Sequence, residues 1–175
     1  MKDTKTELRS RLSQIKLLAL DVDGVLTDGG LYYSDSGEEF KKFNVKDGQG
    51  LKLIMQAGIE VAIITASTST SVTHRAQKLG ISHAFIGVEN KLSVLENLCH
   101  KLNIKLEQVA YIGDDINDIP VLEAVGCPLT VADAMAGNKS SVIYVTELAG
   151  GQGAVREICN FLLKINQDNG LLPKM

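Results

Sequence analysis

Lys16-Leu-Leu-Ala-Leu-Asp-Val-Asp-Gly-Val-Leu-Thr-Asp28 is the stretch of sequence that decides the fold. The run from Ile15 to Leu20 is mostly apolar, too short to cross a membrane and of the right length for a buried strand. It ends at Asp21 and Asp23, whose side chains point the same way in an extended segment and repel each other unless a cation or a shared proton lies between them. A strand followed by an ordinary Asp-Gly turn would explain the same letters. The rest of the chain must therefore show whether a cation site surrounds this pair.

Composition narrows the class of protein. The chain has 175 residues, enough for one compact domain with its own core, and a net charge of -3, which argues against nucleic acid as the main partner. Three cysteines with no close pair (Cys99, Cys127 and Cys159) are typical of buried thiols in a reducing compartment. Met1 to Gln14 lacks the apolar core of a signal peptide, and no apolar run is long enough to span a membrane. We expect a cytoplasmic protein without a membrane or nucleic-acid partner.

Short apolar strands alternate with helical patterns along the chain. Strands are expected at 15–20, 61–65, 84–86, 109–112, 128–131 and 142–145, with helices opening at Asp47, in the Ser/Thr-rich run 66–73, at Lys91 and after the glycines at 150–153. This order predicts an α/β fold, a Rossmann-like parallel sheet flanked by helices. We divide the chain into an N-terminal segment 1–14, either frayed or a short surface helix, a domain 15–165 and a polar tail 166–175.

Residues 28–47 read as a β-hairpin. Two β-prone arms flank the turn-rich tetrad 34–37, and four of the eight Tyr and Phe residues lie here: Tyr32, Tyr33, Phe40 and Phe43. A protruding hairpin cannot bury that many aromatic side chains by itself, so we expect a subunit interface, with packing back onto its own core as the alternative.

Polar residues end three of the predicted strands. Asp21 and Asp23 follow the first strand, Thr65 ends the second, and Asp114 with its neighbour Asp115 follows the fourth. Ligands of α/β sheets bind outside the carboxyl ends of strands, so these groups converge and form a hard oxygen site suited to Mg²⁺. Lys91 could balance an anion there, although most lysines are simply solvated. Thr65 could bind a phosphate or merely end its strand.

The order of these motifs resembles the haloacid dehalogenase superfamily of aspartyl phosphotransferases. The residues that carry the likeness are the DxDGxxT run from Asp21, Thr65, Lys91 and the GDDxxD run at 113–118. The resemblance implies that Asp21 is the nucleophile and that Asp23 is the general acid and then the base.

The same resemblance implies the metal and phosphate contacts. Asp114, the Asp21 carboxylate and the Asp23 carbonyl would hold Mg²⁺, with Asp115 and Asp118 as a further ligand or a second layer around it. Thr65, the backbone at Ala66, and Lys91 would hold the phosphoryl oxygens.

Within the superfamily the chain has room for a hairpin but not for a cap domain, and it is similar to the capless 3-deoxy-D-manno-octulosonate 8-phosphate phosphatases. The likeness rests on runs at 21–29, 43–50, 75–81, 111–118, 131–134 and 150–159. It implies a homotetramer built through the 28–47 hairpin, a substrate site lined by Asp47, Gly48, Arg75 and Lys91, and a glycine segment 150–153 near a subunit interface or the active-site mouth. The implied function is Mg²⁺-dependent hydrolysis of that sugar-acid phosphate through an aspartyl-phosphate, in lipopolysaccharide biosynthesis.

One departure weakens the substrate assignment. The family commonly has Gly-Arg after the motif threonine, where this chain has Ala66-Ser67, so a bidentate clamp for an anion is missing. A nonulosonic acid 9-phosphate is therefore the second substrate to consider. Two further hypotheses are a broad-specificity phosphatase and a non-catalytic oligomerisation module of the same fold, and the intact Asp23 argues against the module.

Overall fold

The computed structural model describes residues 4–170, with the backbone alone for residues 4 and 5. Its centre is a six-stranded parallel sheet in the order β5-β4-β1-β6-β7-β8. The strands are β1 Leu17–Leu20, β4 Glu60–Ile64, β5 His83–Phe85, β6 Val109–Ile112, β7 Cys127–Thr130 and β8 Tyr144–Val145. The α/β prediction is confirmed, and each predicted strand is present with its ends shifted by at most a few residues.

Strand β1 lies between β4 and β6, and all four of its residues are buried. Leu18 pairs with Val61 and Ala110 on one face of the sheet, and Leu17 and Ala19 lie in the core on the other face, so apolar residues fill both faces. After β1 the chain forms β4 and β5 on one side of β1, and it then crosses back to form β6, β7 and β8 on the other side. The carboxyl end of β1 is thus the switch point at which α/β sheets open a crevice.

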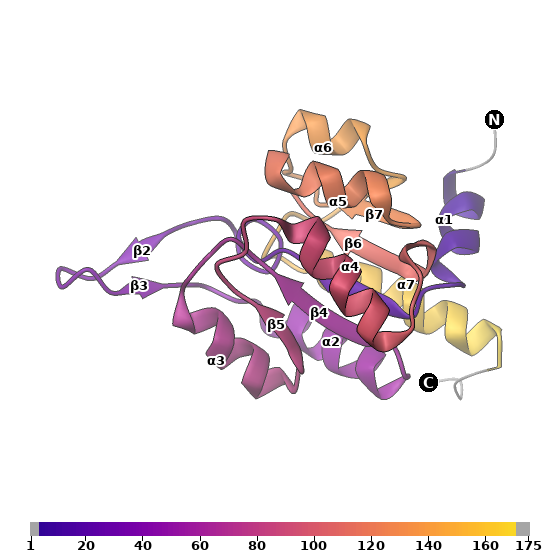
Figure 1. Cartoon of the computed structure of the whole chain (residues 1–175), viewed down its shortest axis with the longest axis horizontal. Coiled ribbons are helices and arrows are strands. Elements are labelled where there is room, and N and C mark those ends of the chain that lie inside the picture. The colour runs from indigo at the N-terminus through magenta and orange to yellow at the C-terminus, as the bar shows by residue number, and fades with distance from the viewer. Residues whose placement is uncertain (1–3, 171–175) are drawn as a thin grey trace.

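Helices cover both faces of the sheet, so the body has three layers (Figure 1). The helices are α1 Thr4–Leu12, α2 Val45–Gln56, α3 Thr70–Leu79, α4 Lys91–Leu102, α5 Ile119–Ala124, α6 Ala136–Ser140 and α7 Ala154–Asp168, with 3-10 turns η1 Leu106–Gln108 and η2 Ile116–Asp118. Apolar side chains of α1, α2, α3 and α7 share a core with one face, and those of α4 and α5 share a core with the other. The alternation of side chains along β1 supplies both cores.

The predicted hairpin is present as β2 Tyr32–Tyr33 and β3 Glu39–Phe40 and projects from the body at the end opposite the two termini (Figure 1). Tyr32 is 48% exposed and Phe40 is 54% exposed. Tyr32, Tyr33 and Phe40 do not fold back onto the core, whereas Phe43, nearer the body, packs against it. Within residues 4–170 this hairpin is the only insertion between β1 and α2, and no cap domain is present.

The two ends of the chain differ in part from the predicted segments. The N-terminal segment contains a helix, α1, whose Leu8 and Leu12 are buried in the same core as α7. At the other end, α7 continues through Asp168, three residues into the predicted tail. Residues 1–3 and 171–175 lie outside the described part. No helix in residues 4–170 is long and apolar enough to cross a membrane.

Candidate active site

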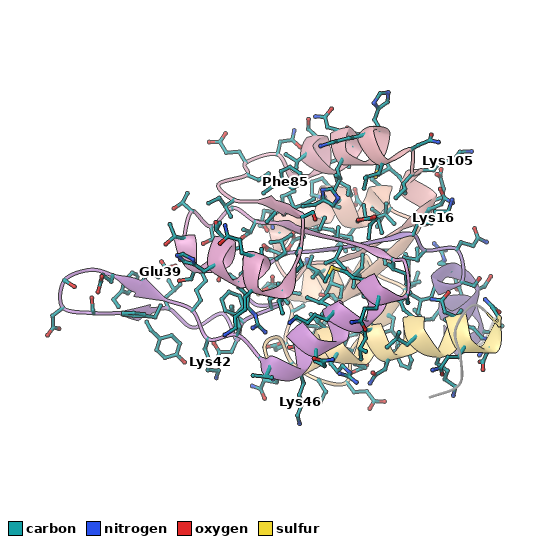
Figure 2. All side chains as sticks on the ribbon, turned by 90° about the horizontal axis from the view of Figure 1, so that it is seen from below. Lys16, Glu39, Lys42, Lys46, Phe85 and Lys105 are labelled. Atoms are coloured by element: carbon teal, nitrogen blue, oxygen red, sulfur yellow. The ribbon has the colours of Figure 1, made fainter. Side chains whose placement is uncertain are left out.

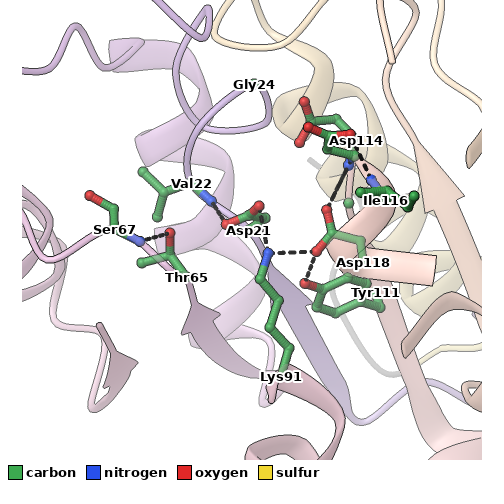
Figure 3. Close-up of polar contacts among 12 residues, drawn as sticks. Asp21, Val22, Gly24, Thr65, Ser67, Lys91, Tyr111, Asp114, Ile116 and Asp118 are labelled. Carbon is green, nitrogen blue, oxygen red and sulfur yellow. Dashed lines mark hydrogen bonds and ion pairs between the residues drawn. The ribbon is translucent and has the colours of Figure 1, made fainter. Parts of the chain in front are cut away.

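The polar strand ends do converge. Asp21 directly follows β1, Thr65 follows β4, Asp114 lies just after β6, and Lys91 is the first residue of α4 (Figure 3). Because β1, β4 and β6 are adjacent and parallel, their carboxyl ends meet at one edge of the sheet. The prediction that these residues form one site is consistent with this arrangement.

Lys91 is the electrostatic centre of the site. Its Nζ lies 2.7 Å from Asp21 Oδ2 and 2.7 Å from Asp118 Oδ1, and the residue is only 3% exposed. The start of α4 is held by Asn90, whose side chain accepts a hydrogen bond from the Ser93 N–H. A buried ammonium between two carboxylates is the paired arrangement that a buried charge requires.

Asp118 organises the loop that follows β6. Its Oδ1 accepts a 2.6 Å hydrogen bond from the Tyr111 hydroxyl, and its Oδ2 accepts from the backbone N–H groups of Asp114 at 3.0 Å and Asp115 at 3.3 Å. Asp118 is fully buried. It therefore holds both Lys91 and the backbone of Asp114, and its role as a further ligand or a second-layer residue stays a prediction.

The site has more negative than positive charge. Burial raises the pKa of Asp21, Asp118 raises it further, and Lys91 opposes both. Burial by itself lowers the pKa of Lys91, but its two carboxylate partners outweigh this and the net pKa is raised, so the ammonium stays charged. Burial, followed by the charges of Asp21 and Asp118, raises the pKa of Asp114 to about 7. One lysine does not neutralise three carboxylates, and a further cation would relieve the repulsion.

The donor set fits a hard divalent cation. Asp21, Asp114 and Asp118 each offer a carboxylate oxygen, and these oxygens lie within 4.8 Å of one another. Asp114 Oδ1 is buried and has no hydrogen-bond partner among the described residues, whereas the Asp118 oxygens are already engaged. A Cβ on Gly24 would collide with Asp114 Oδ2, so the loop backbone next to Asp23 lies directly against this carboxylate. Oxygen ligands from carboxylates and backbone are what Mg²⁺ prefers.

Asp115 lies at the edge of this group. Its Oδ1 accepts a hydrogen bond from the Ile116 N–H and caps η2, and the residue is exposed. Asp115 thus serves the turn that brings Asp118 inward. Its predicted role as a further ligand or second-layer residue stays a prediction.

Asp23 has a partner that the sequence analysis did not name. Lys41, just beyond β3, places its Nζ 2.7 Å from Asp23 Oδ1 and 3.0 Å from Glu39 Oε1, and the Lys41 side chain is 1% exposed. Asp23 itself is partly exposed, with 38% of its side chain open to solvent. The predicted acid/base therefore faces the solvent side of the site while a residue of the hairpin holds its carboxylate.

The loop after β4 is polar and tightly turned. Thr65 is buried, and its Oγ1 accepts a hydrogen bond from the Ser67 N–H at 3.2 Å; the Ser67 hydroxyl accepts from the Ser69 N–H at 3.3 Å. Ala66 is exposed between them. The loop thus presents hydroxyl and backbone N–H groups beside Asp21, as Figure 3 shows, but no charged side chain at position 67.

Three predicted substrate residues form a separate group between α2, α3 and α7. Asp47 is buried, and its Oδ1 accepts the Arg156 N–H of the first turn of α7 at 2.7 Å. Arg75 donates to the Asn44 carbonyl at 3.0 Å, and a Cβ on Gly48 would collide with the Arg75 guanidinium. None of the hydrogen bonds found for Asp47 or Arg75 in residues 4–170 reaches the Asp21 centre, so their substrate contact stays a prediction.

The glycine segment 150–153 lies directly behind residues 21–28, which follow β1 and are called the catalytic loop below. A Cβ on Gly150 would collide with the Gly24 carbonyl, and the Gly151 N–H donates to the Val25 carbonyl at 3.0 Å. The Gly150 N–H is held by Asp133 Oδ1 at 2.9 Å. Gly24 is therefore packed between Asp114 on one side and Gly150 on the other.

Tyr111 and Lys41 are site residues that the sequence analysis missed. The signal for Tyr111 is a hydroxyl inside the otherwise apolar strand run 109–112, where a buried polar tip needs a partner. The signal for Lys41 is weaker, because the run Lys41-Lys42 offers two charges that ordinarily indicate a solvated edge.

A family model and the sequences of known proteins both match this chain to one family of hydrolases. A family model described as haloacid dehalogenase-like hydrolase matches residues 42–126. The protein named 3-deoxy-D-manno-octulosonate 8-phosphate phosphatase KdsC from Salmonella typhi is 48% identical over 158 residues, which are 90% of this chain and 84% of that protein.

Solved structures agree with the sequence matches. The 3-deoxy-D-manno-octulosonate 8-phosphate phosphatase from Yersinia pestis superposes with a TM-score of 0.90 and 43% identity, over 92% of this chain and 87% of that one. The enzyme of that name from Moraxella catarrhalis, described as a complex with a magnesium ion, a phosphate ion and a KDO molecule, gives a TM-score of 0.90 at 42% identity, over 94% of this chain and 96% of the other.

Proposed function

Since the chain belongs to the haloacid dehalogenase-like hydrolases, and within them to the 3-deoxy-D-manno-octulosonate 8-phosphate phosphatases, we propose that it hydrolyses this sugar-acid phosphate to the free sugar acid and phosphate, with Mg²⁺ as cofactor. It is a phosphoric monoester hydrolase. The observation that carries the proposal is the group of three carboxylates at the switch point of the sheet, of which Asp21 and Asp118 are buried and paired with Lys91. Burying charged groups costs desolvation free energy, and a domain that served only to oligomerise would have no use for such a cluster.

Asp21, Asp114 and the backbone carbonyl of Asp23 would hold the Mg²⁺. When bound, the cation supplies charge neutralisation that lets a carboxylate approach a phosphate. Asp118 keeps the Asp114 loop in place through its two backbone hydrogen bonds.

Asp21 carries the phosphoryl group in the proposed reaction. Its carboxylate attacks phosphorus and the bond from phosphorus to the sugar oxygen breaks, which gives an aspartyl-phosphate and the free alcohol. Asp23 gives its proton to the leaving sugar oxygen and later takes one from the water that attacks the aspartyl-phosphate; the bond between phosphorus and the Asp21 oxygen then breaks, which releases phosphate and restores the Asp21 carboxylate. Lys91 and Thr65 hold the phosphoryl oxygens, Lys91 with its charge and Thr65 with its hydroxyl.

Ser67 is the residue that gives reason to consider a second substrate. Its hydroxyl forms only a neutral hydrogen bond within its own loop, so the substrate carboxylate lacks the bidentate partner that related chains offer here. A nonulosonic acid 9-phosphate carries the same two anionic groups on a longer chain and remains the runner-up.

Other properties of the enzyme are proposed with it. The exposed aromatic residues of the hairpin support a homotetramer assembled through residues 28–47. All three cysteines are unpaired and buried, which suits the reducing cytoplasm. The sugar acid would serve lipopolysaccharide biosynthesis.

The test is a panel of phosphate esters assayed with Mg²⁺ and with EDTA. We expect Mg²⁺-dependent turnover with a strong preference for the octulosonate 8-phosphate. Preference for a 9-phosphate would replace the substrate, comparable rates on unrelated esters would indicate a broad phosphatase, and no activity from a stable tetramer would indicate an assembly module.

A further inference from the structure

Lys41 is the group in the site to which neither the motifs nor the comparisons assign a role. It comes from the hairpin, yet its ammonium is buried and lies 2.7 Å from the carboxylate of Asp23. Among the described residues, Lys41 is the only side chain that bonds to this carboxylate. An exposed carboxylate with two free torsions otherwise samples many orientations, and only a few aim it at a substrate.

Glu39 gives Lys41 a second anchor. Its Oε1 lies 3.0 Å from the Lys41 Nζ, and its Oε2 accepts a 3.1 Å hydrogen bond from the Tyr33 hydroxyl across the hairpin. The position of the ammonium is therefore fixed by a second carboxylate and does not depend on Asp23 alone. This support is typical of side chains that hold a catalytic residue in place.

The neighbouring lysine behaves differently. Lys42 is 59% exposed and pairs with Asp28 Oδ2 instead of Asp23. Figure 2 shows Glu39 and Lys42 on opposite sides of the hairpin base. Successive side chains of an extended segment alternate in this way. Of the two lysines only Lys41 bonds to Asp23, whereas Lys42 bonds to Asp28, so the chain contains its own matched control.

We propose that Lys41 is a positioning residue for the acid/base Asp23, and that the hairpin is thereby a working part of the catalytic centre. This rests on the proposed phosphatase function. It differs from a substrate contact, in which Lys41 would bind the sugar acid, and from a simple tie that fastens the hairpin to the body.

Leaving-group dependence separates these roles. A poorly positioned acid slows esters whose leaving oxygen needs a proton and spares those whose leaving oxygen does not. The probes are phenyl phosphate and 4-nitrophenyl phosphate, which have similar shapes but leaving groups of very different basicity, together with the sugar-acid ester that the wild type prefers. The value compared is kcat/KM, because it reports transfer to Asp21 and is blind to the later hydrolysis of the aspartyl-phosphate.

For Lys41→Met we expect kcat/KM to fall about 10- to 100-fold on phenyl phosphate and on the sugar-acid ester, because a misplaced general acid loses part of its effect. On 4-nitrophenyl phosphate, whose leaving group needs no proton, kcat/KM should fall less than about 3-fold. Lys41→Arg should recover part of the loss, and Lys42→Met should match the wild type on all three esters.

Three results would overturn the proposal. Equal losses on both aryl esters would make Lys41 a structural tie, a loss confined to the sugar-acid ester would make it a substrate contact, and unchanged kinetics would leave it no role. Failure of the proposed function is visible separately, because it appears as a wild type and a Lys42→Met variant that hydrolyse no ester at all.

Discussion

At the scale of single residues, the site depends on one ammonium among three carboxylates. Lys91 sits at 2.7 Å from both Asp21 and Asp118, and Asp114 Oδ1 is left without a partner among the described residues. The arrangement holds Asp21, the proposed nucleophile, in place, and it leaves the site with more negative than positive charge. The roles proposed for Asp21, Lys91 and Asp114 can thus be tested by separate substitutions.

Asp21→Asn should reduce turnover of the preferred ester by about 10⁴-fold or more, because the amide cannot carry the phosphoryl group. The fold should survive, since Lys91 keeps its 2.7 Å pair with Asp118. Steady-state assays and thermal melts measure the two effects. Asp28→Asn, in the same loop but paired only at the surface, is the control, and substantial activity in Asp21→Asn would rule out the assigned nucleophile.

Removal of metal should make stability fall as pH rises. A carboxyl group whose pKa is higher in the folded protein than in the unfolded chain favours folding below the unfolded value and loses that contribution as pH rises through the folded one. For Asp114 this window runs from 3.8 to about 7. With EDTA present, the wild type should lose about 1 to 2 kcal/mol relative to Asp114→Asn between pH 4 and 8, after a discount for solvent screening, or roughly 2–8 °C in Tm.

Mg²⁺ should reverse this trend in the wild type. Its stabilising effect should be larger at pH 8 than at pH 5, and Asp114→Asn should lose most of it. Thermal melts over a pH series with EDTA and with Mg²⁺ measure both effects. A parallel pH dependence of wild type and variant in EDTA would show that Asp114 titrates normally.

At the scale of elements, close backbone contacts hold the loops of the site in register. Gly24 lies between the Asp114 carboxylate and Gly150, and the segment of Gly150 leads into α7. Neither contact leaves space for a Cβ. The position of Asp23 therefore depends on a segment more than a hundred residues away in sequence.

Gly150→Ala should displace the catalytic loop. We expect overpacking to reduce stability by about 1–3 kcal/mol, and we expect turnover of every ester to slow by about 10-fold or more, on the order of what small misplacements of catalytic groups cost. The control is Gly137→Ala in α6, where an added Cβ meets its nearest neighbour at 3.7 Å. Melts and kinetics measure the pair of variants, and normal activity in Gly150→Ala would show that the loop is positioned without this contact.

At the scale of the whole molecule, the hairpin joins two roles. One face carries Glu39 and Lys41 to the catalytic loop, and the other carries Tyr32 opposite Phe40, both largely exposed. An exposed aromatic pair on a two-stranded ribbon gains little stability without a partner surface.

The double variant Tyr32→Ser, Phe40→Ser should shift the protein to smaller species at micromolar concentration, because it removes the apolar contact between copies. Sedimentation velocity or light scattering measures the shift. Leu148→Ser, at an exposed apolar residue away from the hairpin, should leave the assembly unchanged. A wild type that is already monomeric would exclude assembly through the hairpin.

Local pattern by itself predicted the strands, the helices α2, α3, α4 and α7, and the polar strand ends that converge. A short apolar run indicates a strand buried on both faces, and 3.6-residue spacing indicates an amphipathic helix, so the strand leading to Asp21 and the helix that opens at Lys91 are visible in the sequence. The order of motifs also pointed to the family, which the relatives bear out.

Only the tertiary structure decided which distant residues serve Asp21 and Asp23. The bond from Lys41 to Asp23, the bond from Tyr111 to Asp118 and the contact of Gly150 with Gly24 join segments through space. Charge pairing and close packing depend on distance after folding, and no spacing along the chain encodes that distance. The opening strand thus placed two carboxylates at one strand end and the family resemblance implied their chemistry, while the fold supplied the partners that contact them.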